Sequence, residues 1–184
     1  VHVDVKKIGN IPDGGGWRYV GRQQGKRNRA ATAGKPKNTH RQPKMGYAFV
    51  HSVIDDHSRL VYSEVHDDET AVTATAVLVR AVDWFAQRGV TIERVLSDNG
   101  SAYKSHLWHT VCDQQGITVK KTRPYRPQTN GKIERFHKTL ADGWAYARCY
   151  ASEQERRDAL ATGSTSTITT GPTQPAPTSH PSPA

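Results

Sequence analysis

The chain is poor in cysteine and has no long apolar run. Its 184 residues include two cysteines, Cys112 and Cys149, and no CxxC pair, so the sequence supports neither a disulfide framework nor a zinc site. Cys112 falls in a predicted helix, and we expect it to be a small buried apolar residue. No apolar stretch approaches the roughly 18 residues of a membrane span, and no secretory signal opens the sequence. We therefore expect a cytoplasmic protein without a membrane partner.

Nucleotide-binding and metal-binding motifs are missing as well. The patterns GxGxxG and GxxxxGK[ST] do not occur, and the run Gly14-Gly15-Gly16 fits neither. A Rossmann-type or P-loop enzyme is therefore disfavoured. His106, His109 and His137 have no convergent spacing with the cysteines, which excludes the common zinc motifs.

Acidic residues are absent from residues 18–44, although that segment holds nine Lys and Arg and the whole chain has a net charge of +9. Such a charge favours a polyanionic partner, here DNA. Residues 10–44 are rich in Gly and show no sustained periodicity, so we interpret them as a mobile basic loop inserted after the first strand. Its predicted DNA contacts are Arg18, Arg22, Lys26, Arg27 and Arg29.

The remaining pattern is that of an α/β fold. Strands are predicted at 1–8, 46–54, 60–66, 91–97 and 117–121, and helices at 71–87, 105–115 and about 131–147. Three strands followed by alternating helices and strands predict a mixed five-stranded sheet flanked by helices. The expected core stripe of the last helix is Ile133, Phe136, Leu140 and Trp144. Residues 162–184 contain no charged residue and one large apolar one, so we expect a folded core at 1–161 and a disordered Thr/Ser/Pro-rich tail.

Three acidic residues stand out against this background. Asp98 ends an apolar run just before an Asn-Gly pair, Glu134 lies on the last predicted helix 35 residues further on, and Asp4 lies inside the apolar run of residues 1–5. A buried carboxylate is costly unless something neutralises it, and a metal would do so. Taken singly, Asp98 fits a helix cap and Glu134 a surface acid. Together the three acids favour phosphodiester chemistry on two Mg²⁺ ions.

The neighbouring Asp55 and Asp56 also compete for a metal role. They lie in the short connection between two predicted strands, where Asp and Ser are common turn residues. We therefore interpret residues 55–59 as a hairpin turn rather than a metal site.

Two further segments carry a family resemblance. Residues 97–101 read Ser-Asp-Asn-Gly-Ser, and residues 124–135 read Pro-Tyr-Arg-Pro-Gln-Thr-Asn-Gly-Lys-Ile-Glu-Arg. They resemble the catalytic core of DDE transposases and retroviral-type integrases, in particular bacterial insertion-sequence transposases. Residues 53–59 are similar to that family's second strand and turn, and the resemblance covers about residues 1–160. It implies a ribonuclease-H-like fold.

The resemblance also implies roles for single residues. Asp4, Asp98 and Glu134 would be catalytic, with Asp4 and Asp98 bridging two Mg²⁺ (or Mn²⁺) ions and Glu134 holding one. The implied reactions are nicking of a DNA element end and transfer of its 3′-hydroxyl to target DNA. The implied DNA contacts in and after the loop are Tyr125, Gln128, Asn130, Lys132 and Lys138. The family further implies a homo-oligomer on DNA, in the bacterial cytoplasm near the nucleoid.

Alternatives to strand transfer remain open. A ribonuclease-H-type nuclease would cleave RNA–DNA hybrids without joining DNA ends, and an inactive remnant would only bind DNA. Similar transposases carry an N-terminal helix-turn-helix and a closing Arg-Pro-His stretch. We expect a truncated copy whose residues 162–184 come from a frameshift. Translating the underlying DNA beyond Leu160 in the other two frames tests this.

Overall fold

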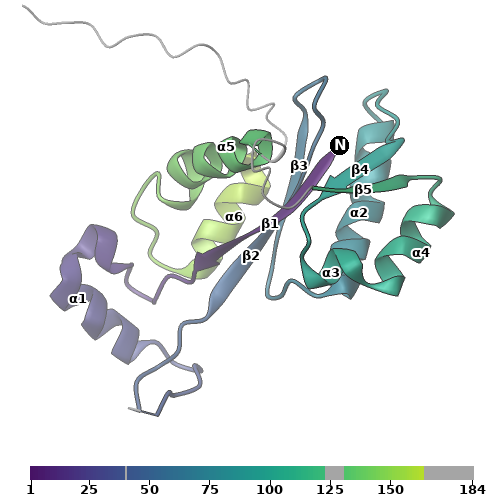
Figure 1. The fold of residues 1–184 in the computed structure, drawn as a ribbon. Helices are drawn as coiled ribbons and strands as arrows, with labels where there is room; N and C mark the ends of the chain where they lie inside the picture. Colours follow the sequence, from purple (N-terminus) through teal and green to yellow (C-terminus); the bar gives the residue numbers. More distant parts are fainter. Residues whose placement is uncertain (40, 123–130, 164–184) are drawn as a thin grey trace, which may run out of the picture.

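A mixed sheet of five strands forms the centre of the protein (Figure 1). The computed structural model describes residues 1–39, 41–122 and 131–163, with side chains to residue 160. The strands are β1 (His2–Gly9), β2 (Tyr47–Ile54), β3 (Val61–His66), β4 (Arg94–Ser97) and β5 (Thr118–Lys121), in the order β3-β2-β1-β4-β5. The first three strands pair antiparallel and β1, β4 and β5 pair parallel. The predicted α/β architecture is confirmed.

Helices cover both faces of this sheet because the strands alternate their apolar residues (Figure 1). On β1, Val3 joins a core cluster with the helices α2 (Ala71–Ala86), α3 (Ser101–Lys104) and α4 (His106–Gln114). Ile8 points the other way and joins a second cluster with α5 (Gly131–Leu140), the π-helical turn η2 (Ala141–Ala145) and α6 (Glu153–Gly163). Asp4 and Ile8 are separated by an even number of residues on β1, so their side chains point to the same face of the sheet. Asp4 therefore faces α5.

The predicted helices 71–87 and 105–115 are confirmed as α2 and α4. Thr70 caps α2 by accepting a hydrogen bond from the Thr73 N–H, and Leu78 and Phe85 are buried on its inner face. Gly89 follows the helix with a φ of 74°, a conformation that suits glycine. Cys112 on α4 is fully buried, as expected.

The last predicted helix divides into three parts. All four residues of its predicted stripe are buried, but α5 ends at Leu140 and continues as η2 only to Ala145. A separate helix, α6, then packs back on this region. Arg156 of α6 is fully buried and donates to the Gly9 carbonyl at 3.1 Å and to Glu153 at 2.7 Å. The Trp144 indole N–H in turn donates to the Arg156 carbonyl at 2.7 Å, which ties η2 to α6.

The interpretation of residues 10–44 as a loop was wrong, because residues Trp17–Ala31 form the helix α1. The insertion follows β1 as expected, yet it is a folded element. Its helix shows no apolar periodicity because it buries Gly25 and Asn28 instead of an apolar stripe. The Asn28 amide donates to the carbonyls of Gly14 at 2.6 Å and Gly15 at 3.0 Å, so polar contacts replace apolar packing.

The sequence also predicted a chain without a membrane span and with a disordered tail. Throughout the described ranges, no helix combines the length and the apolar character that a membrane crossing requires. The predicted disordered tail falls almost wholly on residues 164–184, which lie outside the described residues; α6 includes its first two positions.

Candidate active site

Asp4 lies on β1, and Asp98 follows the end of the neighbouring strand β4. The parallel strands β1 and β4 pair His2 with Leu96, and this register, continued by two residues, leads from Asp4 to Asp98. Asp98 directly follows Ser97, the last residue of β4. Two acids that are far apart in the sequence are thus brought to the same place by parallel strand pairing.

The Asn-Gly pair after Asp98 has a structural reason. The Gly100 N–H donates a hydrogen bond to Asp98 Oδ1 at 2.8 Å. A Cβ atom on Gly100 would lie only 2.9 Å from that same oxygen, closer than side chains tolerate. Glycine at this position therefore lets the backbone approach the carboxylate and fix one of its two oxygens.

Glu134 is exposed in the first turn of α5. A chain of polar contacts fixes this end of the helix: Lys132 Nζ lies 3.0 Å from Asp56 Oδ1, and Asp56 Oδ2 lies 2.5 Å from His2 Nε2. Since His2 belongs to β1, the start of α5 is tied to the strand that carries Asp4. Lys132, predicted to contact DNA, is thus engaged with Asp56 in this structure.

The hairpin turn has the role that its sequence predicts, together with one that it does not. Asp55 Oδ2 accepts hydrogen bonds from the Ser58 N–H at 2.7 Å and the Ser58 hydroxyl at 2.6 Å, which is ordinary turn chemistry. Asp56 also joins His2 to Lys132, a contact between elements that turn chemistry alone does not suggest.

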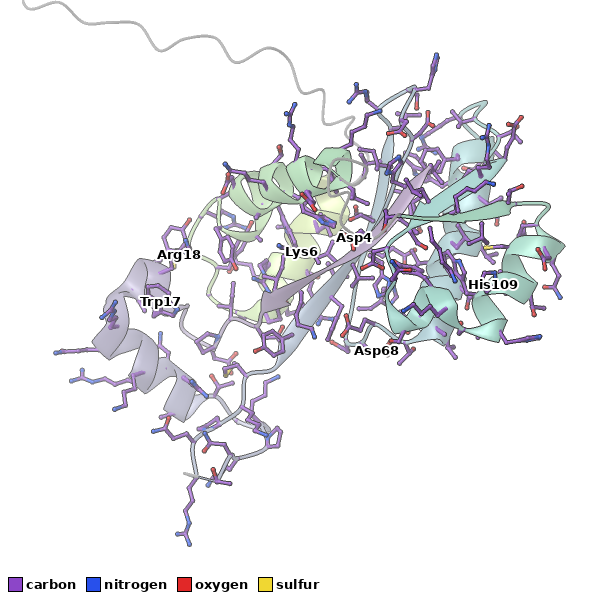
Figure 2. The ribbon with its side chains drawn as sticks, viewed as in Figure 1. Asp4, Lys6, Trp17, Arg18, Asp68 and His109 are labelled. Atoms are coloured by element: carbon purple, nitrogen blue, oxygen red, sulfur yellow. The ribbon has the colours of Figure 1, made fainter. Side chains whose placement is uncertain are left out.

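Asp4 is the electrostatic centre of the site. Figure 2 shows it beside Lys6 on β1, in the middle of the molecule. Burial, with the negative charges of Asp98 and Glu134, raises the pKa of Asp4 to about 6, although the Val5 N–H and Lys6 act against this rise. Because both other acids contribute to this rise in pKa, Asp98 and Glu134 lie near enough to act on the charge of Asp4.

A chain of polar side chains, most of them buried, lies next to Asp4, and the sequence did not predict it. His137 Nδ1 lies 3.5 Å from Asp4 Oδ2, and its Nε2 lies 3.3 Å from the Ser52 hydroxyl, to which Ser63 donates at 3.0 Å. Burial and the charge of Lys6 lower the pKa of His137 to about 4, so the ring is neutral at pH 7. His137 follows Glu134 by about one helical turn, and this spacing was the feature of the sequence that could have identified it.

The donor set fits a hard divalent cation. Its three members offer carboxylate oxygens, the ligands that Mg²⁺ and Mn²⁺ prefer, and their mutual repulsion is what a bound cation would relieve. Within the described ranges, no three His, Cys, Asp or Glu side chains stand as a preassembled metal-ligand group. Asp98 and Glu134 therefore act on the charge of Asp4, but the three acids do not form a ready coordination shell.

The other predicted DNA-binding residues fall into three groups. Tyr125, Gln128 and Asn130 lie outside the described residues, and Lys138 is exposed on α5 one turn beyond Glu134. The α1 cations lie apart from the acids, beyond the far end of β1 (Figure 1). Of these, Arg18 stacks on the Tyr146 ring at 4.4 Å and Arg29 donates to the Pro43 carbonyl at 2.8 Å, whereas Arg22, Lys26 and Arg27 are exposed.

Comparisons with known proteins agree with this architecture. The family described as Integrase core domain matches residues 31–127, and a second family of the same description matches residues 115–163. The first match includes Asp98 and the second includes Glu134. Asp4 and most of α1 precede both matches.

Two of the related proteins are viral. The Gag-Pol polyprotein of bovine immunodeficiency virus (strain R29) is 30% identical over 89 residues, which are 48% of this chain and 6% of that protein. ORF3, a candidate integrase of Spiroplasma virus SpV1-C74, is 30% identical over 129 residues, which are 61% of this chain and 33% of ORF3. The chain therefore spans a small part of the curated relatives that it matches.

A solved structure shows the same fold. A chain of the simian T-cell lymphotropic virus intasome, solved in complex with PP2A regulatory subunit B56 gamma, superposes with a TM-score of 0.52 at 22% identity. The likeness covers 77% of this chain and 55% of that chain, and it confirms the ribonuclease-H-like fold. With the family match over residues 31–127, the conclusion is direct: the chain belongs to the integrase core domain family.

Proposed function

We propose that the chain is the catalytic domain of a DDE-type transposase or integrase, which nicks DNA ends and transfers the freed 3′-hydroxyl to target DNA. The observation that carries this proposal is that Asp98 and Glu134 lie near enough to the buried Asp4 to raise its pKa. A net charge of +9 supports a polyanionic substrate, and membership of the integrase core family supports the reaction class.

Integrase core domains are metal-dependent. We assign Asp4, Asp98 and Glu134 as the residues that hold the metal, as two Mg²⁺ or Mn²⁺ ions. When bound, such ions activate the attacking oxygen and neutralise charge on the leaving oxygen.

The remaining residues of the site orient its acids. Gly100 fixes one oxygen of Asp98, the Val5 N–H fixes one oxygen of Asp4 at 2.8 Å, and His137 faces the other. The Lys132–Asp56 pair holds the start of α5, which presents Glu134. Such orientation lowers the entropy lost when reacting groups are aligned.

Substrate contacts complete the proposal. Lys138, exposed on α5, would neutralise a phosphate near the acids, and Tyr125, Gln128 and Asn130 would contact the element end. The cations of α1 would contact the backbone further away. By analogy with the intasome relative, we propose that the protein works as a homo-oligomer on DNA.

The test is metal-dependent joining of an oligonucleotide 3′-hydroxyl to target DNA. Glu134→Gln should reduce joining roughly 100-fold or more, because the amide is a poorer metal ligand than the carboxylate. The matched control is Glu93→Gln, at an exposed acid outside the site, which should join DNA like the unchanged protein.

Other outcomes contradict the proposal and identify the alternatives. Equal products from the unchanged protein and Glu134→Gln would exclude the assigned site. Cleavage of an RNA–DNA hybrid without any DNA joining would indicate a ribonuclease-H-type nuclease. Salt-sensitive DNA binding that Asp98→Asn leaves unchanged, with no metal-dependent nicking, would indicate a protein that only binds DNA.

A further inference from the structure

Helix α1 folds back on itself. Gly21 has non-helical angles (φ 81°, ψ 161°) and separates the first turn from the rest. A Cβ atom on Gly25 would lie 2.6 Å from the Trp17 Cα, although eight residues of a straight helix span about 12 Å. The first turn therefore lies against the second part of α1, and only glycine at position 25 permits this approach.

This fold-back displays an aromatic side chain. Trp17 is 59% exposed and lies on α1 well apart from Asp4 (Figure 2). The contacts of Arg18 with the Tyr146 ring at 4.4 Å and of the Tyr19 hydroxyl with the Tyr146 carbonyl fix the first turn on the core. Trp17 is thus a large apolar ring held at the surface, where a ligand could contact it.

Trp17 lies at the wall of a cleft between α1 and the segment 36–44. Its described residues 36–39 and 41–44 pair with each other, and the Lys44 N–H donates to the Pro36 carbonyl at 2.8 Å. Arg29 ties this segment to α1 through the Pro43 carbonyl at 2.8 Å. The cleft has a volume of about 570 Å³, within the usual range for ligand sites.

The cleft is strongly basic. Besides Trp17 and Arg29, its walls include Arg22, Lys26, Lys37 and Arg41. Among the described residues, none of these four cations forms an ion pair with a carboxylate, and residues 18–44 contain no acid. Their positive charges are therefore available to a polyanion.

Cations beside an exposed indole match a nucleic acid whose bases are unpaired. In a duplex the base faces are stacked on one another, so an exposed indole would gain nothing there. In a single strand each base offers a free face, and aromatic stacking adds to phosphate pairing. We propose that this cleft binds an unpaired stretch of DNA, with a base stacked on Trp17 and its phosphates paired with Arg22, Lys26, Lys37 and Arg41.

The choice of DNA rests on the proposed function, whereas the site itself is separate from the acids. Most of α1 precedes residue 31, where the integrase core match begins. We therefore assign to the cleft the binding of a single-stranded DNA segment outside the acid site.

The experiment compares binding of a labelled single strand and of a duplex of equal length by fluorescence anisotropy, with EDTA present and at fixed salt. Trp17→Ala should weaken single-strand binding roughly 10-fold and leave duplex binding within about twofold. Trp17→Phe should retain most of the single-strand affinity. The control is Tyr47→Ala, an aromatic residue of similar exposure (56%) that does not line this cleft.

A second measurement uses the intrinsic tryptophan fluorescence. In the unchanged protein a single strand should quench part of this fluorescence, and Trp17→Phe should lose that part of the quenching. The same affinity of Trp17→Ala and unchanged protein for the single strand, an equal loss for both DNAs, or tighter binding of a single-stranded RNA than of the DNA would overturn the proposal. Because EDTA removes catalysis from the measurement, failure here leaves the Glu134→Gln test unaffected, and the reverse also holds.

Discussion

Asp4 occupies a place where a neutral side chain would be more stable. Its side chain is 20% exposed and lies in the field of Asp98 and Glu134. Desolvation and like charges both oppose its ionised form, which is the form that a metal ligand needs. The fold therefore retains an unfavourable charge at the site, as is common where function and stability compete.

A pH-dependent gain in stability follows for Asp4→Asn. The folded-state pKa of Asp4 is raised to about 6 from 3.8, so its contribution to stability is fully present below pH 3.8 and is lost as the pH rises through 6. In EDTA at pH 7, Asp4→Asn should be more stable than the unchanged protein by on the order of 2 kcal/mol, and near pH 3.5 the difference should vanish. Urea unfolding at both pH values measures this.

The control for Asp4→Asn is an exposed acid. Asp113→Asn, at an exposed acid on α4, should show no such gain between the two pH values. A gain for Asp4→Asn that is the same at pH 3.5 and pH 7 would contradict the burial-driven shift.

We expect Ser52 to select the tautomer of His137. The Ser52 hydroxyl accepts from Ser63, and we expect it to donate its own proton to His137 Nε2. The proton of the neutral imidazole would then be on Nδ1, which faces Asp4 Oδ2 at 3.5 Å. In this arrangement His137 would act as a positioning residue for Asp4.

Removal of the Ser52 hydroxyl should allow His137 to adopt the other tautomer. In Ser52→Ala, the ¹⁵N signals of His137 should shift away from the Nδ1–H tautomer, and kcat for strand transfer should fall roughly 10-fold with little change in KM. Ser58→Ala, at an exposed turn serine, is the control. An unchanged His137 tautomer in Ser52→Ala would show that Ser52 does not set it.

At the scale of elements, α6 holds the layer that presents Glu134. Arg156 is fully buried, donates to β1 at the Gly9 carbonyl, and lies over the Trp144 ring at 5.7 Å. It therefore joins α6, η2 and the end of β1. Its partner Glu153 also accepts from the Ile11 N–H at 3.1 Å, so the same contact orders the chain entering the insertion.

Arg156→Met should lower the free energy of unfolding by about 3 kcal/mol, because it leaves Glu153 as a largely buried charge with one partner fewer. Urea denaturation at pH 7 measures the change. Arg148→Met removes an ion pair with Glu155 in which Arg148 is 58% exposed, and it should cost less than about 1 kcal/mol. Equal effects of the two substitutions would show that the Arg156 contact is no stronger than a surface pair.

Over the whole molecule, opposite charges are separated along β1. Asp4 lies in the first half of β1 and Asp98 follows the parallel strand β4, whereas α1 with its cations lies beyond the other end of β1 (Figure 1). This separation is what a protein needs when one part binds metal and another binds the DNA backbone. It also explains why the net charge of +9 coexists with a local excess of carboxylates around Asp4.

Much of the fold was predictable from local pattern. The five strands follow from apolar alternation, α2 follows from spacings of three and four, and the buried stripe of α5 follows from Ile133 and its neighbours. Helix α1 was not predictable in this way. Its stability depends on Gly25 against Trp17 and on Asn28 against distant carbonyls, contacts that no periodicity reports.

The sequence by itself determined the chemistry available to this protein: three acids, their spacing of 35 residues between Asp98 and Glu134, and an excess of cations. Only the tertiary structure decided which groups act on one another. Parallel pairing set Asp4 beside Asp98, the docking of α5 brought His137 to Ser52, and the fold-back of α1 placed Trp17 among cations. Residue types and spacing follow from the sequence alone, whereas burial and non-local contacts, which set pKa values and form clefts, exist only after the chain has packed.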